Sequence, residues 1–571
     1  MMKKTLDRRT FILGGGALGA AAAGSIALAS CAPQTVESEE APKQELSDDF
    51  VMDAQKADAK WSFEIPPEPI PEDQITETVE ADVIVVGAGT SGLCTAVSAA
   101  EQGLSVTLIS ASKAPVSRGG SNFAVNSKIM EREGIPPVDI DSVANRERMM
   151  ASNNIDQNKW MRFLNNSEES MNWLVDLMED HGVQMTIEMS PPEKLFPKGD
   201  IQHVSPAAHA AIDENTVAGI GQPLIVNALA EILQELGGTV VYRMKAEQLI
   251  RDDNNTGRVS AVIAQNLQEE TYVKYVGTKA IVLATGDFSA DKEMMRKYCP
   301  SMLSLIADDA GEDYDIGLYT KGLFKGEGHK MGLWVGAGWQ HTVPNAPMVN
   351  VAQGTAAHAF CGHCGLALNV NGERFSNELA MHSFTGRAVL MQPEGAEFPI
   401  WGTNYAKDNG PWYVDGSHDD EPLSAEEMLA SWDADAEAGY FTKADTLEEL
   451  IDALGLPKEK ALASIERYNE LCEKGVDEDF HKRSDQMIPV RDAPFYGMRQ
   501  EGRFLTVLGG LRTNVNLQVC QDDDTPIEGL YNVGTMVGDF ASDTYTFLME
   551  GLNYGSCITF GYLLGRDLAK L

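Results

Sequence analysis

The sequence predicts an α/β fold organised around a parallel β-sheet. Residues 81–86 form a short, β-branched apolar run that breaks at a glycine-rich turn and continues into the helical pattern of residues 93–100. Residues 103–109 then have the pattern of a second strand, so strand, turn, helix and strand follow in the order that parallel pairing requires. A later apolar strand within residues 279–288 stops at a Thr-Gly pair. These segments indicate a Rossmann-like sheet.

Length and charge limit the possible functions. The chain has 571 residues, of which 43% are hydrophobic, enough for roughly two to four domains with buried cores. Lys and Arg total 45 against 85 Asp and Glu, so the net charge is −40. This charge argues against nucleic acid as a partner, and an acidic membrane surface would repel it. It either keeps an exported protein soluble or steers a basic electron-transfer partner.

The N-terminus has the pattern of an export signal. Arg8 and Arg9 precede an apolar run rich in Gly and Ala that ends near Ala29, and the run is too short for a membrane span. It resembles a twin-arginine signal, and Leu28-Ala29-Ser30-Cys31 resembles a lipobox in which Cys31 receives the lipid. The alternative is an ordinary cleaved signal with an incidental cysteine. We therefore expect a signal over residues 1–30, an acidic, Pro-containing tether over 31–78, and a location outside the cytoplasm with a lipid anchor in the cell membrane.

The turn after the first strand has the spacing of a dinucleotide site. Gly87 permits the tight turn, Gly89 lets a pyrophosphate approach the backbone, and Gly92 allows close packing of helix and strand. Ser110 stands where an acidic residue usually binds the adenosine ribose, so its hydroxyl would make a weaker bond. Lys113 is either solvated or a cofactor contact.

Further segments carry a family resemblance. Residues 224–236 have the pattern of an amphipathic helix, and residues 239–243 and 259–263 those of strands. Together with Arg-Gly-Gly-Ser-Asn at residues 118–122, they resemble the flavoprotein subunits of the fumarate reductase and succinate dehydrogenase superfamily, especially its exported single-subunit fumarate and urocanate reductases. The resemblance runs from about residue 82 to the C-terminus and includes the segments 326–332, 372–378 and 529–534.

The resemblance implies the domain organisation and the cofactor. It implies a discontinuous, Rossmann-like FAD-binding domain over residues 79–340 and 490–571, with an α+β capping (substrate) domain inserted at 341–489. FAD is expected to be non-covalent, because residues 118–122 lack the histidine to which membrane-complex relatives attach it. The implied cofactor-binding residues are Gly87, Gly89, Ser91, Gly92, Ser110, Lys113, Gly120, Ser121, Asn122, Ala246, Thr285, Gly286, Asp287, Gly534, Asp539 and Leu552.

The family's chemistry predicts three catalytic residues, two of them in the cap. In these enzymes reduced flavin N5 delivers hydride to one alkene carbon while a side-chain acid protonates the other. The count from Arg374 places His382 at the acid's position, and Arg387 takes the role if the alignment slips. Tyr545 is the nearest match to a carboxylate-binding arginine of the family. His382 is otherwise a surface or packed histidine, and Tyr545 a core aromatic residue.

The family resemblance also bears on the substrate and on the direction of the reaction. Several substrate-binding cations of the family are missing, so fumarate is not the expected substrate. We expect a reductase of a larger, less charged enone, unsaturated acid or ester. The alternatives are a flavin dehydrogenase of the ketosteroid 1-dehydrogenase type, which is related through residues 559–562, and a non-catalytic flavin electron carrier.

The cysteines give no haem motif. Among eight cysteines only Cys361 and Cys364 have a C-x-x-C spacing, and Gly365 follows instead of the histidine that haem attachment needs. This pair is either redox-active or structural, and no metal site is expected. Electrons would therefore come from an external donor, such as a membrane-bound c-type cytochrome or a quinol-linked partner.

Overall fold

In the computed structural model the compact unit is Trp61–Leu571, and Met1–Lys60 are assigned to a separate unit. The expected signal and Cys31 lie outside the described residues. The structure describes residues 60–188, 208–216, 220–305, 324–344, 348–350, 365–379, 382–409, 412, 423–504, 506–541 and 551–571.

The main sheet has eight strands in the order β16-β17-β9-β1-β2-β6, with β8 also pairing with β9 and β7 with β8. Five strands, β17, β9, β1, β2 and β6, run parallel to one another, which confirms the expected α/β fold, while β16 and β8 pair antiparallel with β17 and β9. The strands are β1 (Ile75–Val86), β2 (Val106–Ser110), β6 (Thr239–Tyr242), β7 (Met244–Arg251), β8 (Val259–Asn266), β9 (Tyr272–Leu283), β16 (Gln518–Cys520) and β17 (Pro526–Asn532).

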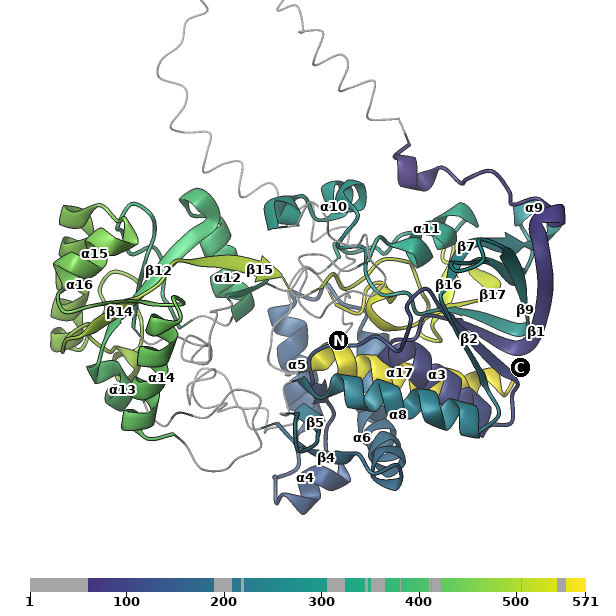
Figure 1. The fold of residues 1–571 in the computed structure, drawn as a ribbon, viewed down its shortest axis with the longest axis horizontal. Helices are drawn as coiled ribbons and strands as arrows, with labels where there is room; N and C mark the ends of the chain where they lie inside the picture. Colours follow the sequence, from purple (N-terminus) through teal and green to yellow (C-terminus); the bar gives the residue numbers. More distant parts are fainter. Residues whose placement is uncertain are drawn as a thin grey trace, which may run out of the picture. The chain divides into compact units, whose positions relative to one another are not determined.

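The residues of β1 alternate between two apolar clusters. Val83 and Val85 pack with helices α3 (Thr90–Glu101), α6 (Gln157–Asp180), α8 (Gln222–Glu235) and α17 (Leu552–Leu568). Ile84 and Val86 pack with β7, β8 and α11 (Glu327–Trp334) on the other face. Figure 1 shows α3, α8 and α17 side by side along one side of the sheet. This two-residue period fits a central strand that is buried on both faces.

Helix α17 packs closely against α3. A Cβ atom on Gly561 would lie 2.8 Å from Cβ of Cys94, and one on Gly565 would lie 2.6 Å from the backbone nitrogen of Ala99. Two glycines one helical turn apart therefore let the two backbones approach each other.

The folded unit begins before the expected boundary at residue 79. The 3₁₀ helices η1 (Ser62–Glu64) and η2 (Glu72–Gln74) precede β1, which already starts at Ile75. Phe63 is buried against Phe288 and Met294. Because this ring removes apolar surface from water, residues 61–78 belong to the folded unit and not to an extended tether.

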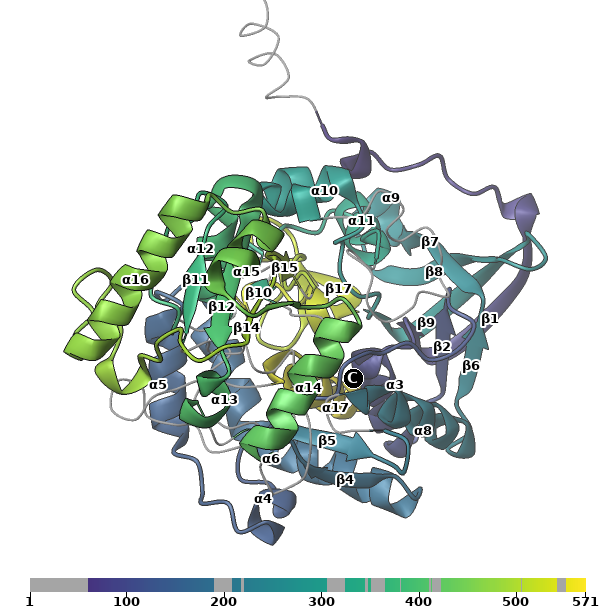
Figure 2. The same ribbon diagram turned by 60° about the vertical axis from the view of Figure 1, so that its left-hand side comes forward.

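A second, six-stranded sheet forms the centre of the cap, in the order β10-β15-β12-β14-β13 with β11 paired to β12. Its strands are β10 (Met348–Asn350), β11 (Leu366–Leu368), β12 (Ala396–Gly402), β13 (Thr442–Ala444), β14 (Phe495–Gly497) and β15 (Gln500–Phe504). Trp401, Trp432 and Tyr496 are buried in its core. Residues 495–504 thus extend this sheet past the expected cap boundary at 489. Figure 2 shows α14, α15 and α16 around the sheet.

The remaining elements complete the described chain. A small sheet has the order β3-β5-β4, with β3 (Asn122–Phe123), β4 (Gln184–Ile187) and β5 (Ala208–Ile212). Among the described residues, no helix is both long and apolar enough to span a membrane. The other helices are α4 (Lys128–Arg132), α5 (Ile140–Met150), α9 (Asp252–Asn255), α10 (Lys292–Tyr298), η4 (Pro300–Leu305), α12 (His382–Leu390), η6 (Pro393–Gly395), α13 (Asn404–Asp408), α14 (Ala425–Glu437), α15 (Leu447–Leu454), α16 (Lys458–Lys474), η7 (Ser484–Gln486) and η8 (Gly534–Met536).

Candidate functional site

The glycine turn after β1 forms an open cradle at the N-terminus of α3. A Cβ atom on Gly87, whose φ is +119°, would lie 2.1 Å from the carbonyl oxygen of Ala284, and one on Gly92 would lie 2.1 Å from that of Gly87. Both glycines are therefore required by close packing. A Cβ atom on Gly89 would meet only the carbonyl oxygen of Val116, at 3.5 Å. The space beside Gly89 thus fits a pyrophosphate facing the helix N-terminus.

Polar groups around this turn fit a bound dinucleotide. Gln222 donates from Nε2 to Oγ1 of Thr90, the first residue of α3, at 3.0 Å. Asn122 donates from Nδ2 to the carbonyl oxygen of Gly120 at 2.6 Å. The other amide atoms, Oε1 of Gln222 and Oδ1 of Asn122, are buried and have no partner among the described residues. Hydroxyl or N–H groups of a bound FAD would supply the hydrogen bonds that these two buried acceptors lack.

Four further predicted contacts lie around the N-termini of α3 and α17. A Cβ atom on Gly534 would lie 2.5 Å from Oγ of Ser91 in the first turn of α3. Leu552, the first residue of α17, is buried, and a Cβ atom on the preceding Gly551 would lie 2.4 Å from the carbonyl carbon of Ser121. Segments that are far apart in sequence therefore meet at the ends of α3 and α17.

The expected ribose position after β2 holds a pair of hydroxyls. Oγ of Ser110 lies 2.8 Å from Oγ of Ser112, which donates to the carbonyl oxygen of Ala114 at 2.6 Å. Lys113 between them is exposed, and Ala246 is buried in β7. A hydroxyl pair thus replaces the acidic side chain. Because Ser112 donates its only hydroxyl hydrogen to Ala114, Ser110 donates to Ser112 and keeps its oxygen free to accept a bond from a ribose hydroxyl.

Asp287, at the end of the β9 segment, bonds to protein groups with both carboxylate oxygens. Its Oδ1 accepts from the backbone N–H and the hydroxyl of Ser289 at 2.9 and 2.7 Å. Its Oδ2 accepts from Oγ1 of Thr506 at 2.5 Å and from the backbone N–H of Val507 at 3.0 Å. The neighbouring Thr285 accepts at Oγ1 from the backbone N–H of Gly328 at 3.1 Å, while Gly286 has a φ of +82°. Asp287 therefore ties this loop to residues 506–507.

Asp539 binds a second loop in the same manner. Its Oδ1 accepts from the backbone N–H groups of His341 and Thr342, both at 2.9 Å, and its Oδ2 lies 2.9 Å from Nδ1 of His341. Burial raises the pKa of Asp539, but these hydrogen bonds outweigh burial and leave the pKa below its ordinary value. The buried Lys159 donates to the adjacent carbonyl oxygen of Gly538 at 2.7 Å.

His329, which sequence reasoning missed, is completely buried beside this site. Its Nε2 lies 3.2 Å from the carbonyl oxygen of Gly509, and a Cβ atom on Gly510 would lie 2.3 Å from the imidazole. Burial lowers the pKa of His329 to about 4, although the bond to Gly509 opposes the effect. The ring is thus neutral at ordinary pH and donates to Gly509 from Nε2. In the sequence, His329 follows Gly-Glu-Gly, and nothing in that pattern indicates a functional histidine.

Two of the predicted catalytic residues, His382 and Arg387, belong to the cap helix α12. His382 begins α12, and its side chain lies outside the described residues, as do Tyr545, Cys361 and Cys364. Arg387 is on the same helix. Burial raises the pKa of the Cys299 thiol to about 12, with Asp287 raising it further and Arg387 lowering it.

Helix α12 therefore borders the end of β9. Leu390, in its last turn, packs against the apolar cluster that contains Phe288 and Cys299. The charge of Arg387 acts on the thiol of Cys299 in this cluster. The cap helix with the two predicted proton donors thus lies next to the Asp287 loop.

The segment from Gly372 to Glu378 builds the cap and not the reaction site. Arg374 donates to Glu378 and to Asp477 at 2.9 Å each, and Lys482 donates to Glu378 at 3.1 Å. Burial raises the pKa of Glu378, but Lys482 and Arg374 outweigh it and hold the pKa below its ordinary value. These four side chains form a buried, charge-balanced cluster, which we name the Arg374 cluster.

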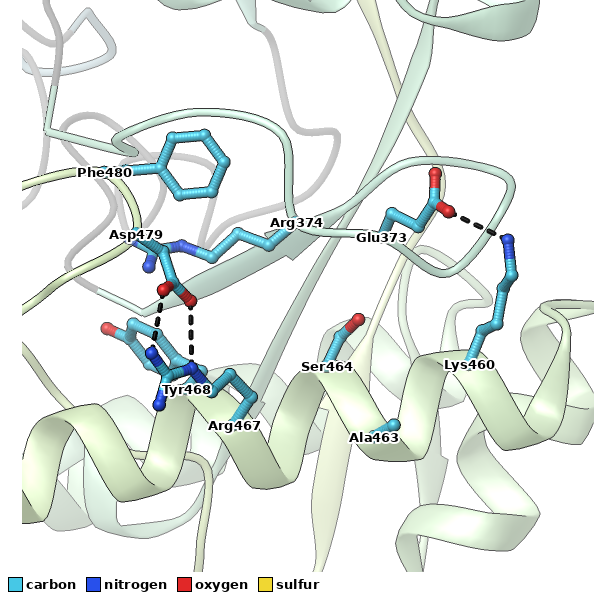
Figure 3. A pocket seen from close by; sticks show the side chains of 9 residues that line it. All are labelled: Glu373, Arg374, Lys460, Ala463, Ser464, Arg467, Tyr468, Asp479 and Phe480. Atoms are coloured by element: carbon cyan, nitrogen blue, oxygen red, sulfur yellow. Dashed lines mark hydrogen bonds and ion pairs between the residues drawn. The ribbon is translucent and has the colours of Figure 1, made fainter.

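A pocket of about 420 Å³ opens beside Arg374 along α16, as Figure 3 shows. Lys460 is paired with Glu373 at 2.8 Å, and Arg467 with Asp479 at 2.9 Å. Its lining residues come from the cap and include none of the predicted FAD contacts. Because these cations are already neutralised and the pocket lies away from the glycine turn, we do not assign the reaction to it. Among the described residues, no cluster of three or more His, Cys, Asp or Glu side chains is arranged to hold a metal ion.

The geometry defines a flavin-binding fold with an inserted cap, and comparison with known proteins agrees. The family described as "FAD binding domain" matches residues 82–544, so the chain belongs to this family. This confirms FAD as the cofactor, the predicted class of FAD-dependent oxidoreductase and the resemblance to fumarate reductase flavoproteins.

Three individual proteins illustrate the similarity. The chain is 27% identical to the vinyl phenol reductase of Lactiplantibacillus plantarum, over 86% of this chain and 95% of that protein. It is 25% identical to the NADH:fumarate oxidoreductase of Klebsiella pneumoniae, over 86% of this chain but only 48% of that protein. The crystal structure of a 3-ketosteroid-Δ4-(5α)-dehydrogenase from Rhodococcus jostii shares the fold, with a TM-score of 0.66, 21% identity and coverage of 88% of this chain and 100% of that one.

Proposed function

We propose that the chain is an FAD-dependent reductase of an activated carbon–carbon double bond in an enone or an unsaturated acid or ester. The observation that carries the proposal is the packing of α12, with His382 and Arg387, beside the loop that follows β9. The vinyl phenol reductase supports the reaction class, because the chain matches nearly the whole length of that relative. When bound and reduced, FAD supplies a hydride from N5 to one carbon of the double bond.

The protein must then supply a proton to the other carbon. His382 is the first candidate, because an imidazole has a pKa near working pH. Arg387 is the second, because it lies on the same helix and its charge, like that of Asp287, acts on the Cys299 thiol. We expect His382→Ala to lower turnover by about a hundredfold while FAD stays bound, as for the loss of a general acid. If His382→Ala keeps normal turnover and Arg387→Gln loses it, the donor is Arg387.

Residues 506–508 favour a substrate with little charge. The hydroxyl of Thr506 is engaged by Asp287, and the next two side chains, Val507 and Leu508, are apolar and buried. These three residues offer no cation to a substrate carboxylate. A buried carboxylate without a partner is costly, so fumarate is a poor substrate in this proposal.

The deciding experiment measures anaerobic oxidation of reduced methyl viologen by the FAD-loaded protein. The panel contains fumarate, urocanate, hydroxycinnamates, a vinyl phenol, an enone steroid and an unsaturated lactone. Turnover of a bulky enone, cinnamate or vinyl phenol without turnover of fumarate supports the proposal. Turnover of fumarate contradicts the argument from residues 506–508, and no turnover across the panel contradicts the reductase assignment.

A dehydrogenase that runs in the opposite direction is the second candidate. The shared fold of the ketosteroid dehydrogenase favours it. Anaerobic mixing of the oxidised protein with a saturated 3-ketosteroid separates the two candidates, since a dehydrogenase would bleach the flavin absorbance within one turnover. A flavin electron carrier would neither be bleached by the steroid nor oxidise viologen with any alkene.

We also propose that the protein is exported, anchored through a lipid on Cys31, and reduced by a membrane-bound c-type cytochrome or another membrane donor. The paired arginines and the lipobox-like sequence support the first two points. Cys31→Ala should release the protein from the membrane fraction. Failure of reduced membrane cytochromes to reduce the purified protein would argue against this donor.

A further inference from the structure

The chain leaves the FAD-binding part for the cap, and returns to it, through two short segments. Residues 339–342 follow α11 and lead towards β10, and residues 506–511 follow β15. We name them the outgoing and return connections. They lie next to each other, because Trp339 pairs with Leu511 in an antiparallel bridge. Both connections are therefore fixed points at the base of the cap.

The two buried aspartates hold one connection each. Asp539 accepts from both backbone N–H groups of residues 341 and 342 and faces the His341 ring. Asp287 accepts from the hydroxyl of Thr506 and the backbone N–H of Val507. Asp287 and Asp539 are exposed by only 1% and 6%. Each carboxylate thus binds backbone and side-chain donors of a connection that is far from the aspartate in sequence.

The connections are also bonded to each other. Gln340 donates its backbone N–H to the carbonyl oxygen of Gly510 at 2.8 Å, and its Oε1 accepts from the backbone N–H of Gly510 at 2.6 Å. Gly509 donates its N–H to the carbonyl oxygen of Thr535 at 2.7 Å, and its own carbonyl oxygen faces His329. Every backbone N–H and C=O group of Gly509 and Gly510 is therefore engaged, which fixes this turn between cap and FAD site.

We propose that Asp287 and Asp539 are positioning residues that fix the two connections of the cap, and are not ligands of FAD. A carboxylate only accepts hydrogen bonds, and the groups around both aspartates are donors. The inference rests on the proposed function in one respect, because the cap carries the predicted proton donors. Loosening either connection would move α12 relative to the flavin and slow proton delivery, since small displacements of a donor cost large factors in rate.

The test replaces each aspartate by its uncharged isostere. Asp287→Asn and Asp539→Asn introduce an NH₂ group that opposes the N–H donors of the connection. Asp291→Asn is the matched control, because Asp291 caps α10 through the N–H groups of Glu293 and Met294 and touches neither connection. Amide hydrogen exchange of the FAD-loaded protein, FAD stoichiometry, flavin absorbance and kcat against KM are measured for all three variants.

We expect Asp287→Asn to speed exchange in residues 506–511 and Asp539→Asn in 339–342, each by tenfold or more, with one FAD still bound. The kcat for the best alkene of the panel should fall at least tenfold with KM within twofold, while Asp291→Asn changes neither exchange there nor kcat. Loss of FAD with both connections still protected would overturn the proposal and make the aspartates cofactor ligands. Unchanged exchange in both connections would also overturn it.

Milder variants apply if the isosteres do not fold. Thr506→Val removes one donor to Asp287, and His341→Ala removes one donor to Asp539. Each should raise exchange only in its own connection, and equal changes in both connections would contradict the assignment. If the parent protein reduces no alkene, the proposed function fails, but the exchange and FAD measurements still decide the role of the aspartates.

Discussion

Replacing His329 by glutamine tests the burial of a neutral imidazole beside the Gly509–Gly510 turn. In the folded chain the pKa of His329 is about 4, against 6.5 for an ordinary histidine. Between these values the unfolded chain binds a proton that the folded chain does not. The contribution of His329 to stability is therefore complete above pH 6.5 and is lost as the pH falls towards 4. At 1.36 kcal/mol per pKa unit the total loss is about 3 kcal/mol, of which about 2 kcal/mol is lost between pH 8 and pH 5.

Guanidinium unfolding of the FAD-saturated protein at pH 8 and pH 5 measures this loss. His329→Gln keeps a donor for the Gly509 carbonyl but does not titrate, so its unfolding free energy should fall by about 2 kcal/mol less than that of the parent. His181→Gln is the control, because Glu235 raises the pKa of the exposed His181 and gives an effect of opposite sign. Its stabilisation is present at low pH and is lost as the pH rises. An identical fall for the parent and His329→Gln would refute a neutral, buried His329.

Three further outcomes follow from the site and the cap. Gly89→Ala should give a folded, colourless apoprotein, because its Cβ would fill the cradle and meet protein only at the carbonyl oxygen of Val116, 3.5 Å away. Gly92→Ala should instead lower thermal stability with or without FAD, and equal FAD content in Gly89→Ala and the parent would contradict the cradle. Arg374→Ala removes the ion-pair partner of the buried Asp477 and leaves Glu378 with Lys482 alone, so it should cost about 3–5 kcal/mol in urea unfolding. A loss below about 1 kcal/mol would disprove the Arg374 cluster. Boiling should release all the FAD into the supernatant, and yellow colour in the precipitate would show covalent attachment.

The sequence predicted the part of the fold that depends on local patterns. Gly87 and Gly92 could be assigned because each serves a close contact, within the strand–turn–helix unit or with Ala284 after β9, and Gly89 because the same motif keeps the space beside it open. The start of β1 was harder to predict, since residues 75–80 are mostly exposed, include charged side chains and follow a Pro-rich segment. Strands β14 and β15 were missed because they are short and gain their order from pairing with strands distant in sequence, β12 and β13 for β14, and β12 and β10 for β15.

The predicted site residues also divide into those set by local sequence and those set by contacts distant in sequence. Gly87, Ser91 and Gly534 come together around the N-terminus of α3, and their contact with FAD stays a prediction. The resemblance also implied cofactor contacts for Asp287 and Asp539, but their carboxylates bond to residues that are about two hundred positions away. No local periodicity reports such a pairing, so the role of a buried carboxylate becomes visible only when its donors are known.

The packing of α17 against α3 has a consequence for biosynthesis. The two glycines of α17 contact α3, which directly follows the pyrophosphate turn, yet nearly the whole folded unit lies between these helices in sequence. The ribosome must therefore release α17 before α17 can pack against α3. FAD capture should accordingly be one of the latest events in the maturation of the chain, and nascent chains that stop before residue 551 should emerge without flavin however long they wait.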